Sequence, residues 1–247
     1  MQLIQHYFLH HGGALTEIPF APTGLYDYVV TQDLVLIRAQ RAGLSLCLPW
    51  AKLDVSLRGL TAILDATELY PGVELIGGKV TTTELLKLQL AARTPIGETF
   101  KETLFFLSVE EKERDFSDLG CQRRWWKPKQ RRSFSSAQAT DLDDSYASVV
   151  LELHTHPKWA SEFSATDDAD EHGLRLYALL EDPDSDTPLI RLRASVYGQL
   201  VEIPAGWVFD LPEGWRDPVG KAFADGVGEG ADLGLRVGMC DAQGGAA

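Results

Sequence analysis

The stretch between residues 148 and 204 limits most strongly what this chain can fold into. It contains three runs rich in apolar and branched residues, SVVLELHTH, LRLYALLE and IRLRASVYGQLVEIP, which predict β-strands. Between the first two lies SATDDADEHG, which predicts a short helix with Ser164 or Thr166 near its N-cap and Gly173 at its end. Gly198 predicts a turn or a bulge within the last run.

A helix and a further strand are predicted upstream of these runs. Thr82 or Thr83 can cap the helix, and TELLKLQLAA gives it a broad apolar face. The helix should end near Thr94, because Pro95 disfavours helical backbone at the residue before it. ETLFFLSV then predicts a strand. Strands and helices therefore alternate through the middle of the chain, which favours an α/β sandwich.

The rest of the sequence predicts an N-terminal domain and a C-terminal tail. Residues 1–78 predict a small β-rich domain, in which YDYVVT and DLVLIRA flank the polar pair Gln32-Asp33 and form a hairpin. GLSLCLPW and VELIGG predict further strands of this domain. Residues 79–212 would form the main domain. Residues 213–247 are rich in Gly, Ala and Asp, which predicts a flexible tail.

Composition and cysteine usage predict a cytoplasmic protein with a buried core. The apolar share is 45%, and no run of about 18 apolar residues predicts a membrane-spanning helix. The first residues have no basic region and no long apolar stretch, so no signal peptide is expected. Cys47, Cys121 and Cys240 lie far apart, which favours a reducing compartment over a disulfide framework.

The formal net charge of -13 argues against a protein that binds nucleic acid with its whole surface. One basic segment, RRWWKPKQRR, runs against this balance. Its Trp125 and Trp126 could stack on bases while the basic side chains contact phosphates. A solvated loop that offsets neighbouring acidic runs is the favoured interpretation, and nucleic acid is not an expected partner. Such a loop near an active-site cleft could equally hold an acidic partner.

The residues that carry chemistry lie in HTHPKWASEFSATD, which runs from His154 to Asp167. Residues two apart on a strand face the same side, so the imidazoles of His154 and His156 converge on one point. A carboxylate brought back by the following helix can complete three ligands. Zinc with three nitrogen or oxygen ligands keeps a fourth position open for water, as in a catalytic site, and lowers the pKa of that water to roughly 7.

This segment resembles the motif of the JAMM, or MPN-plus, metalloproteases: His-x-His and Pro, then Ser and Asp at the family's spacing, with every position filled. The resemblance implies a zinc-dependent peptidase or isopeptidase with the JAB/MPN fold, a cytidine-deaminase-like α/β sandwich. It also implies that His154, His156 and Asp167 ligate Zn²⁺. By the same resemblance, Ser164 would hydrogen-bond the developing oxyanion.

The resemblance further implies a general base, a glutamate at the start of the strand after the first helix. Glu102 stands directly before TLFFL and could take a proton from the zinc water and pass it to the leaving amine. The family's glycines do not follow it here, so Glu98 remains an alternative, and Glu152 shares a strand face with the two histidines. Asp168 is expected to face solvent, and residues 170–172 are expected to lie on the helix surface.

A narrower resemblance covers roughly residues 83–210. HTHP, FSATDDADEHGLRLYALL and IRLRASVYG are similar to the JAMM-type proteins of PRTRC cassettes, gene sets of bacterial mobile elements. This implies that the substrate is a ubiquitin-like protein of the same cassette, with ThiF/E1-like and ParB-like proteins as further partners. A zinc nucleotide deaminase is excluded, because H-x-E and P-C-x-x-C are absent. The alternative function is a non-catalytic scaffold of the MPN fold that binds a ubiquitin-like or nucleic-acid-associated partner.

Overall fold

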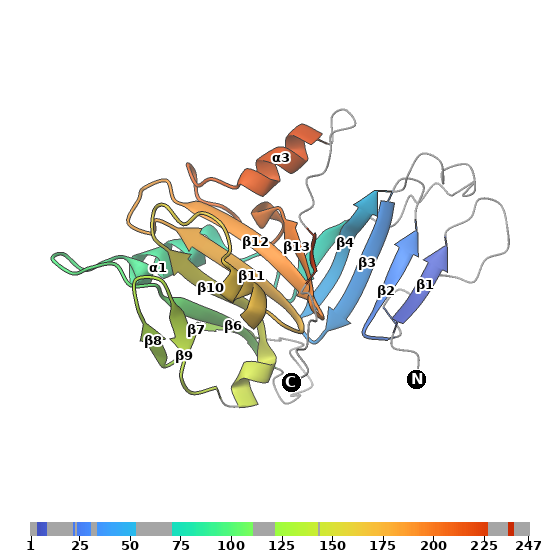
Figure 1. The fold of residues 1–247 in the computed structure, drawn as a ribbon, viewed down its shortest axis with the longest axis horizontal. Coiled ribbons are helices and arrows are strands. Elements are labelled where there is room, and N and C mark those ends of the chain that lie inside the picture. The colour runs from blue at the N-terminus through green and yellow to red at the C-terminus, as the bar shows by residue number, and fades with distance from the viewer. Residues whose placement is uncertain are drawn as a thin grey trace, which may run out of the picture. The chain divides into compact units, whose positions relative to one another are not determined.

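The chain divides into two compact units, Met1–Leu75 and Ile76–Ala247 (Figure 1). Each unit has a sheet of its own. The computed structural model describes residues 4–8, 22, 24–30, 34–52, 71–110, 122–142, 144–226 and 237–239. The division falls close to the boundary expected between residues 78 and 79.

The first unit is a five-stranded sheet with the strand order β1-β2-β3-β4-β5. Its strands are β1 (Ile4–Phe8), β2 (Tyr26–Val30), β3 (Leu34–Arg41), β4 (Leu44–Lys52) and β5 (Gly72–Leu75). β1 and β2 are parallel, and the other neighbours are antiparallel. The predicted hairpin of β2 and β3 is confirmed, with Tyr26 opposite Ala39. A buried ion pair joins the same two strands, with Arg38 Nη2 2.6 Å from Asp27 Oδ2.

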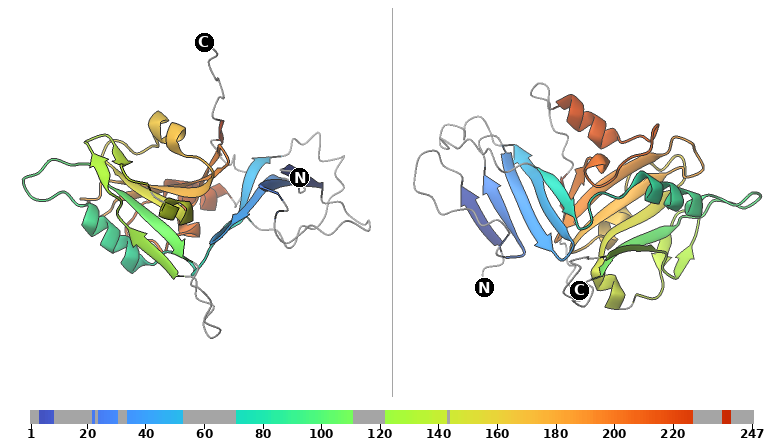
Figure 2. Two further views of the ribbon diagram at one scale, coloured as in Figure 1. Left: turned by 90° about the horizontal axis from the view of Figure 1, so that it is seen from below. Right: turned by 180° about the vertical axis from the view of Figure 1, so that it is seen from behind.

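The second unit is built on a seven-stranded sheet with the order β14-β13-β12-β11-β10-β6-β7 (Figures 1 and 2). Its strands are β6 (Leu104–Glu110), β7 (Gln122–Trp126), β10 (Val149–His156), β11 (Leu174–Glu181), β12 (Leu189–Val196), β13 (Gln199–Ile203) and β14 (Val237–Met239). β10 and β11 run parallel and the other neighbours run antiparallel. Parallel neighbours need a crossover, which here contains the short helix α2 (Ala165–Asp170). Every side chain of β11 is buried, so the core lies around this strand.

The predicted helix before β6 is present as α1 (Thr82–Ala92). Its cap is Thr81 rather than either of the two threonines that follow. The Thr81 hydroxyl accepts from the Glu84 N–H at 3.3 Å, and the Glu84 carboxylate accepts from the Thr81 N–H at 2.8 Å, which makes a capping box. The remaining helical elements are η1 (Asp144–Ser148), η2 (Ala205–Trp207) and α3 (Pro218–Gly226). Across the described ranges, no helix has the length and apolar character needed to cross a membrane.

The α/β sandwich expected from the sequence is wrong. The protein is mostly β-sheet, with 43% strand and 20% helix, and the described residues contain three α-helices and several sheets. Besides the two large sheets there is a hairpin of β8 (Gln130–Arg132) and β9 (Ala137–Ala139). In the described part, three strand-to-strand connections contain an α-helix, and the others contain none. Local patterns did not reveal this, because a strand in a hairpin and a strand followed by a helix have the same alternation of residues.

The basic segment RRWWKPKQRR is not the solvated loop that we expected. It forms most of the edge strand β7 and the strand β8. Trp126 packs with its ring centroid 5.0 Å from that of Phe106, and its indole N–H donates to Ser108 Oγ at 2.6 Å. Arg123 Nη2 lies 2.9 Å from a carboxylate oxygen of Glu84 in α1. Charged side chains are common on edge strands, where they discourage pairing with other chains, so a basic composition did not exclude a strand.

The described part of the C-terminal region is folded, so the expected flexible tail is wrong there. Helix α3 begins with Pro218, and the Asp217 carboxylate before it accepts from the Gly220 N–H at 2.8 Å. Phe223 packs edge-on against Trp207, with ring centroids 5.3 Å apart. β14 adds a strand beside β13. The rest of the expected tail, residues 227–236 and 240–247, lies outside the described residues.

Candidate metal centre

Strand β10 places His154 and His156 on one face of the seven-stranded sheet, because side chains two residues apart point to the same side. In register with His154, β6 contributes Leu104 and β11 contributes Leu179. The two histidines are 9% and 5% exposed. Buried imidazoles need partners for their ring nitrogens, so the groups that face them determine what they can do.

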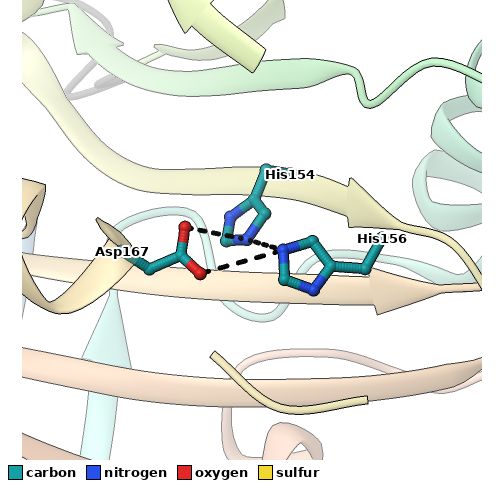
Figure 3. A group of neighbouring side chains, drawn as sticks. All are labelled: His154, His156 and Asp167. Atoms are coloured by element: carbon teal, nitrogen blue, oxygen red, sulfur yellow. Dashed lines mark hydrogen bonds and ion pairs between the residues drawn. The ribbon is translucent and has the colours of Figure 1, made fainter. Parts of the chain in front are cut away.

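Asp167 points from α2 toward the two imidazoles (Figure 3). Its Oδ1 is 3.5 Å from His154 Nε2, and its Oδ2 is 3.8 Å from His156 Nε2. The two Nε2 atoms are 3.1 Å apart. In the described ranges, these three residues are the one group of His, Cys, Asp and Glu close enough to hold a metal ion. The structure thus brings together the three residues that the sequence motif names as ligands.

Ser164 orients the Asp167 carboxylate. It is the N-cap of α2, and its hydroxyl oxygen accepts from the Asp167 N–H at 3.2 Å. In return, Asp167 Oδ2 accepts from the Ser164 N–H at 2.6 Å and from its hydroxyl at 2.8 Å, which completes a capping box. Because the hydroxyl donates to Asp167, the oxyanion contact expected of Ser164 requires this hydrogen bond to break.

The chain after β10 fixes the tautomer of His156. Its Nδ1 lies 2.9 Å from the carbonyl oxygen of Ala160, which can only accept a hydrogen bond. Nδ1 therefore carries the hydrogen, and Nε2 presents its lone pair to the group. Ala160 is held in turn by a hydrogen bond from its N–H to the Pro157 carbonyl at 2.9 Å. A histidine that binds a metal ion through one ring nitrogen usually donates its other ring N–H to a carbonyl, a carboxylate or water.

Electrostatics favour the charge states that ligands need. Burial lowers the pKa of His154, and His156 and Arg193 act in the same direction against the opposing effect of Asp167. Burial alone would raise the pKa of Asp167. The charge of His154, the hydrogen bonds from Ser164 and the charge of His156 oppose burial and together lower this pKa below its usual value. A neutral imidazole and an ionised carboxylate are the forms that bind a metal ion.

Glu102 lies beside His156, with its Oε1 3.9 Å from His156 Nε2, and it is 5% exposed. Its backbone is fixed on both sides. The Glu102 N–H donates to the Ser133 carbonyl at 2.9 Å, and its carbonyl accepts from Arg132 Nε at 2.7 Å. The N–H of the next residue donates to Thr155 Oγ1 in β10 at 2.9 Å. The hairpin after β7 and the central strand thus hold Glu102 in place together.

The other two glutamates considered from the sequence lie in different surroundings. Glu98 is exposed in a turn closed by its N–H to the Pro95 carbonyl, and no contact within the described residues joins it to the histidines. Glu152 shares the histidines' face, but its carboxylate accepts hydrogen bonds from Arg175 and Tyr146.

Burial, together with the charge of Asp167, raises the pKa of Glu102 to about 8. A raised pKa of this kind is typical of a carboxyl group that exchanges protons near neutral pH.

Arg193 of β12 ties α2 to the sheet, a contact that the sequence did not reveal. Its Nε donates to Glu171 at 2.5 Å and its Nη1 donates to Asp168 at 2.6 Å. Its guanidinium also stacks 3.8 Å from the centroid of the Phe163 ring. Glu171 is only 4% exposed, so its expected place on the helix surface is wrong. Asp170 and His172 are exposed as expected, and Asp168 is exposed too, with Arg193 as its partner. These anchors lie on both sides of Asp167 along the chain.

A second arginine of β12 holds the loop that precedes α2. Arg191, which lies on the same face as Arg193, donates from Nε to the Ser161 carbonyl at 2.5 Å. The available sequence signal was the alternation of arginines in IRLRASV, because arginine in a buried strand needs a partner. The partners could not be identified from the sequence, because the fold alone brings residues 161–171 over β12.

The donor set fits a divalent transition-metal ion. Two imidazole nitrogens and one carboxylate oxygen occur together in catalytic zinc sites. Ligand atoms at usual zinc distances in a tetrahedral arrangement lie about 3.3 Å apart, near the 3.1 and 3.5 Å from His154 Nε2 to its two neighbours. Throughout the described chain, no Lys or Arg forms an ion pair with Asp167 or Glu102. A bound cation would supply the positive charge that these two carboxylates lack.

No protein-family model matches the chain, and no curated protein gives a significant match. The resemblance to JAMM proteases therefore depends on the sequence motifs alone, and any function proposed for the protein depends on the chemistry of the site.

Proposed function

We propose that this protein is a zinc-dependent hydrolase of the JAMM type, acting as a peptidase or isopeptidase. The observation that carries the proposal is the convergence of His154, His156 and Asp167 beside the buried Glu102. Three ligands with a neighbouring carboxylate are the parts that metal-assisted hydrolysis of an amide requires. The proposal depends on this site and its sequence motif and makes no use of the fold class.

His154, His156 and Asp167 would hold the metal ion. Two imidazoles among three ligands favour zinc over magnesium or calcium, which prefer oxygen ligands. When bound, Zn²⁺ lowers the pKa of a water in the open position to about 7 and polarises the carbonyl of the scissile bond. Ser164 keeps Asp167 in its ligating orientation through the capping box.

Glu102 would serve first as general base and then as general acid. Its carboxylate accepts a proton from the attacking water and donates it to the leaving amine. Burial raises the pKa of Glu102 to about 8 when no metal ion is bound. The positive charge of a bound Zn²⁺ would lower this pKa, so that the carboxylate could act as the base and its protonated form as the acid near neutral pH. The anchors at Ser133 and Arg132 keep the residue beside His156 throughout.

We further propose that the substrate is a ubiquitin-like protein encoded in the same gene cassette, which is trimmed or deconjugated. ThiF/E1-like and ParB-like proteins would be further partners. This part of the proposal is supported by the motif resemblance alone. A cytoplasmic location is proposed from the isolated cysteines, of which Cys47, the one in the described part, is free.

Metal analysis of the purified protein tests the site. We expect close to one zinc per chain in the wild type and a loss to background in Asp167→Ala. Asp170→Ala is the matched control, because Asp170 lies in the same helix and is exposed. Equally low zinc in the wild type and in Asp167→Ala would overturn the proposal.

A cleavage assay then tests the reaction. Incubation with the ubiquitin-like protein carrying a C-terminal extension should release the extension, and a chelator should prevent the release. If zinc is bound and the ubiquitin-like protein binds but stays intact, the protein is better described as a non-catalytic binding protein.

A further inference from the structure

Three aromatic side chains form a row on the second unit: Phe100, Phe134 and Trp159. The ring centroid of Phe134 lies 6.2 Å from that of Phe100 and 5.7 Å from that of Trp159. Phe134 is 47% exposed and Trp159 is 75% exposed. Aromatic side chains this exposed add little to the core, and aromatic residues are enriched where proteins bind partners. We call these three residues the aromatic row.

The aromatic row is made by the three segments that position the candidate base and one histidine. Its first ring stands two residues before Glu102. Its second ring follows Ser133, whose carbonyl accepts the Glu102 N–H at 2.9 Å. Its third ring precedes Ala160, whose carbonyl lies 2.9 Å from His156 Nδ1. Phe100 is thus two residues from Glu102, and the other two rings adjoin residues whose carbonyls contact Glu102 or His156. The aromatic row therefore borders the candidate metal centre.

The same three segments carry exposed basic side chains, Lys101, Arg131 and Lys158. Among the described residues, no carboxylate forms an ion pair with any of the three. On a chain with a net charge of -13, unpaired cations beside an apolar row favour an acidic and apolar partner. Phe100 lies in the loop between α1 and β6, which projects from the sheet (Figures 1 and 2). The same loop carries Ile96, whose side chain is fully exposed.

We propose that the aromatic row binds an extended segment of the substrate that carries an aromatic or large aliphatic side chain beside acidic residues. This inference rests on the proposed function, because it names the substrate feature that the same site would select. An extended chain points alternate side chains to opposite sides, so one side chain can stack on the row while the next peptide group lies near His156. The acidic neighbours pair with the exposed basic side chains.

Binding of labelled peptides to the zinc-loaded Glu102→Gln variant, measured by fluorescence anisotropy, tests this proposal without cleavage. The probe is a Gly- and Ser-rich peptide with one Phe between two Asp residues. We expect it to bind at least about tenfold more tightly than the same peptide with Ser in place of Phe. Replacing both Asp by Lys should weaken binding by a similar factor and make it less sensitive to salt.

Trp159→Ala and Phe134→Ala, each combined with Glu102→Gln, should each weaken binding of the Phe peptide by about tenfold. The matched control is Leu90→Ala, which removes an apolar side chain that is 70% exposed on α1. It should leave the affinity unchanged. Zinc content and the thermal midpoint of each variant show whether the site and the fold survive the substitution.

Three results would overturn the proposal: equal affinity for the Phe and Ser peptides, affinity that neither Trp159→Ala nor Phe134→Ala alters, and no binding at millimolar protein. Self-association of the wild type that Trp159→Ala abolishes would also overturn it, because a second copy of the chain would then cover the row. The proposed function fails separately, if wild-type protein lacks zinc or leaves the ubiquitin-like protein intact.

Discussion

Strand β10 carries two buried polar clusters on one face, and they are completed in different ways. At Glu152, one carboxylate oxygen accepts from Arg175 Nη1 and from the Tyr146 hydroxyl, both at 2.6 Å. Arg175 also donates to the backbone carbonyls of Val149 and Tyr146 and stacks 4.1 Å from the Tyr146 ring centroid. Two residues further along the strand, His154 begins a cluster of imidazoles and carboxylates that has no arginine or lysine partner among the described residues.

This difference distinguishes a cluster that protein atoms complete from a candidate metal site. A buried charge is tolerated when it is paired and hydrogen-bonded, or when it binds a metal ion. In the Glu152 cluster the guanidinium of Arg175 fulfils that requirement with protein atoms alone. In the His154 cluster the described residues supply imidazole nitrogens and carboxylate oxygens, an arrangement that fits a bound cation. Both clusters contain a buried glutamate near an aromatic or imidazole ring, so the presence of a buried carboxylate does not distinguish them.

The largest expected effect contrasts the two glutamates that could serve as the general base, Glu102 and Glu98. Glu102→Gln should lower kcat by about 10³-fold while the zinc content stays near that of the wild type, because the amide cannot accept a proton. Glu98→Gln is the control, since Glu98 is exposed and should keep full activity. The measurements are initial rates of extension release and zinc per chain. Loss of turnover in Glu98→Gln with full activity in Glu102→Gln would reverse the assignment of the base.

The next effect concerns the structural cluster. Glu152→Ala leaves the buried Arg175 without its carboxylate, so we expect the free energy of unfolding to fall by about 3 kcal/mol. Zinc affinity per folded chain should stay the same. Urea unfolding gives the first quantity, and competition with a chelating dye gives the second. A large loss of zinc affinity in Glu152→Ala would show that the two clusters on β10 are one functional unit.

A smaller effect is expected where the sheet holds α2. Arg193→Met removes the ion pairs to Asp168 and Glu171, which follow Asp167 in α2 and at its C-cap, so zinc affinity should fall by about 10–100-fold. Arg193→Lys should restore only part of the zinc affinity, because an ammonium group cannot pair with both carboxylates in the geometry of the guanidinium. Arg175→Met is the control: it also removes a buried arginine but should affect stability alone. Similar zinc affinities in Arg193→Met and Arg175→Met would contradict the positioning role of Arg193.

The sequence allowed more of the site than of the fold to be predicted. The three clustered residues could be named because His154 and His156 share a strand face and the cap of a short helix fixes the place of Asp167, all within one segment. The roles of Arg132, Arg191 and Arg193 could not be predicted, because each depends on partners brought near by the sheet order. The same limit explains the wrong fold class, since local periodicity identifies a strand but not its neighbours.

The hairpin of β2 and β3 illustrates what short-range patterns can show, because a polar pair between two branched runs determines both strands and their pairing. The strands β7 and β8 illustrate the opposite case. Their charged residues resembled a solvated loop, but β7 pairs with β6 and packs Trp126 on Phe106, and β8 pairs with β9. The folded helix α3 was missed for a related reason, since the Gly- and Ala-rich composition around it concealed its cap and its contact with Trp207.

The smallest expected effect compares two capping boxes. Ser164 and Thr81 both cap a helix, and each accepts from an acidic residue three positions later. Thr81→Ala should cost about 1 kcal/mol of stability and leave zinc binding unchanged, because its partner Glu84 is not a ligand. Ser164→Ala should cost a similar amount of stability and also weaken zinc binding by about tenfold, because Asp167 loses the hydrogen bonds that orient it. Ser164→Thr keeps the hydroxyl and should restore both. If Ser164→Ala instead lowers kcat by more than about 100-fold with unchanged zinc affinity, the hydroxyl acts on the oxyanion as the sequence motif implies.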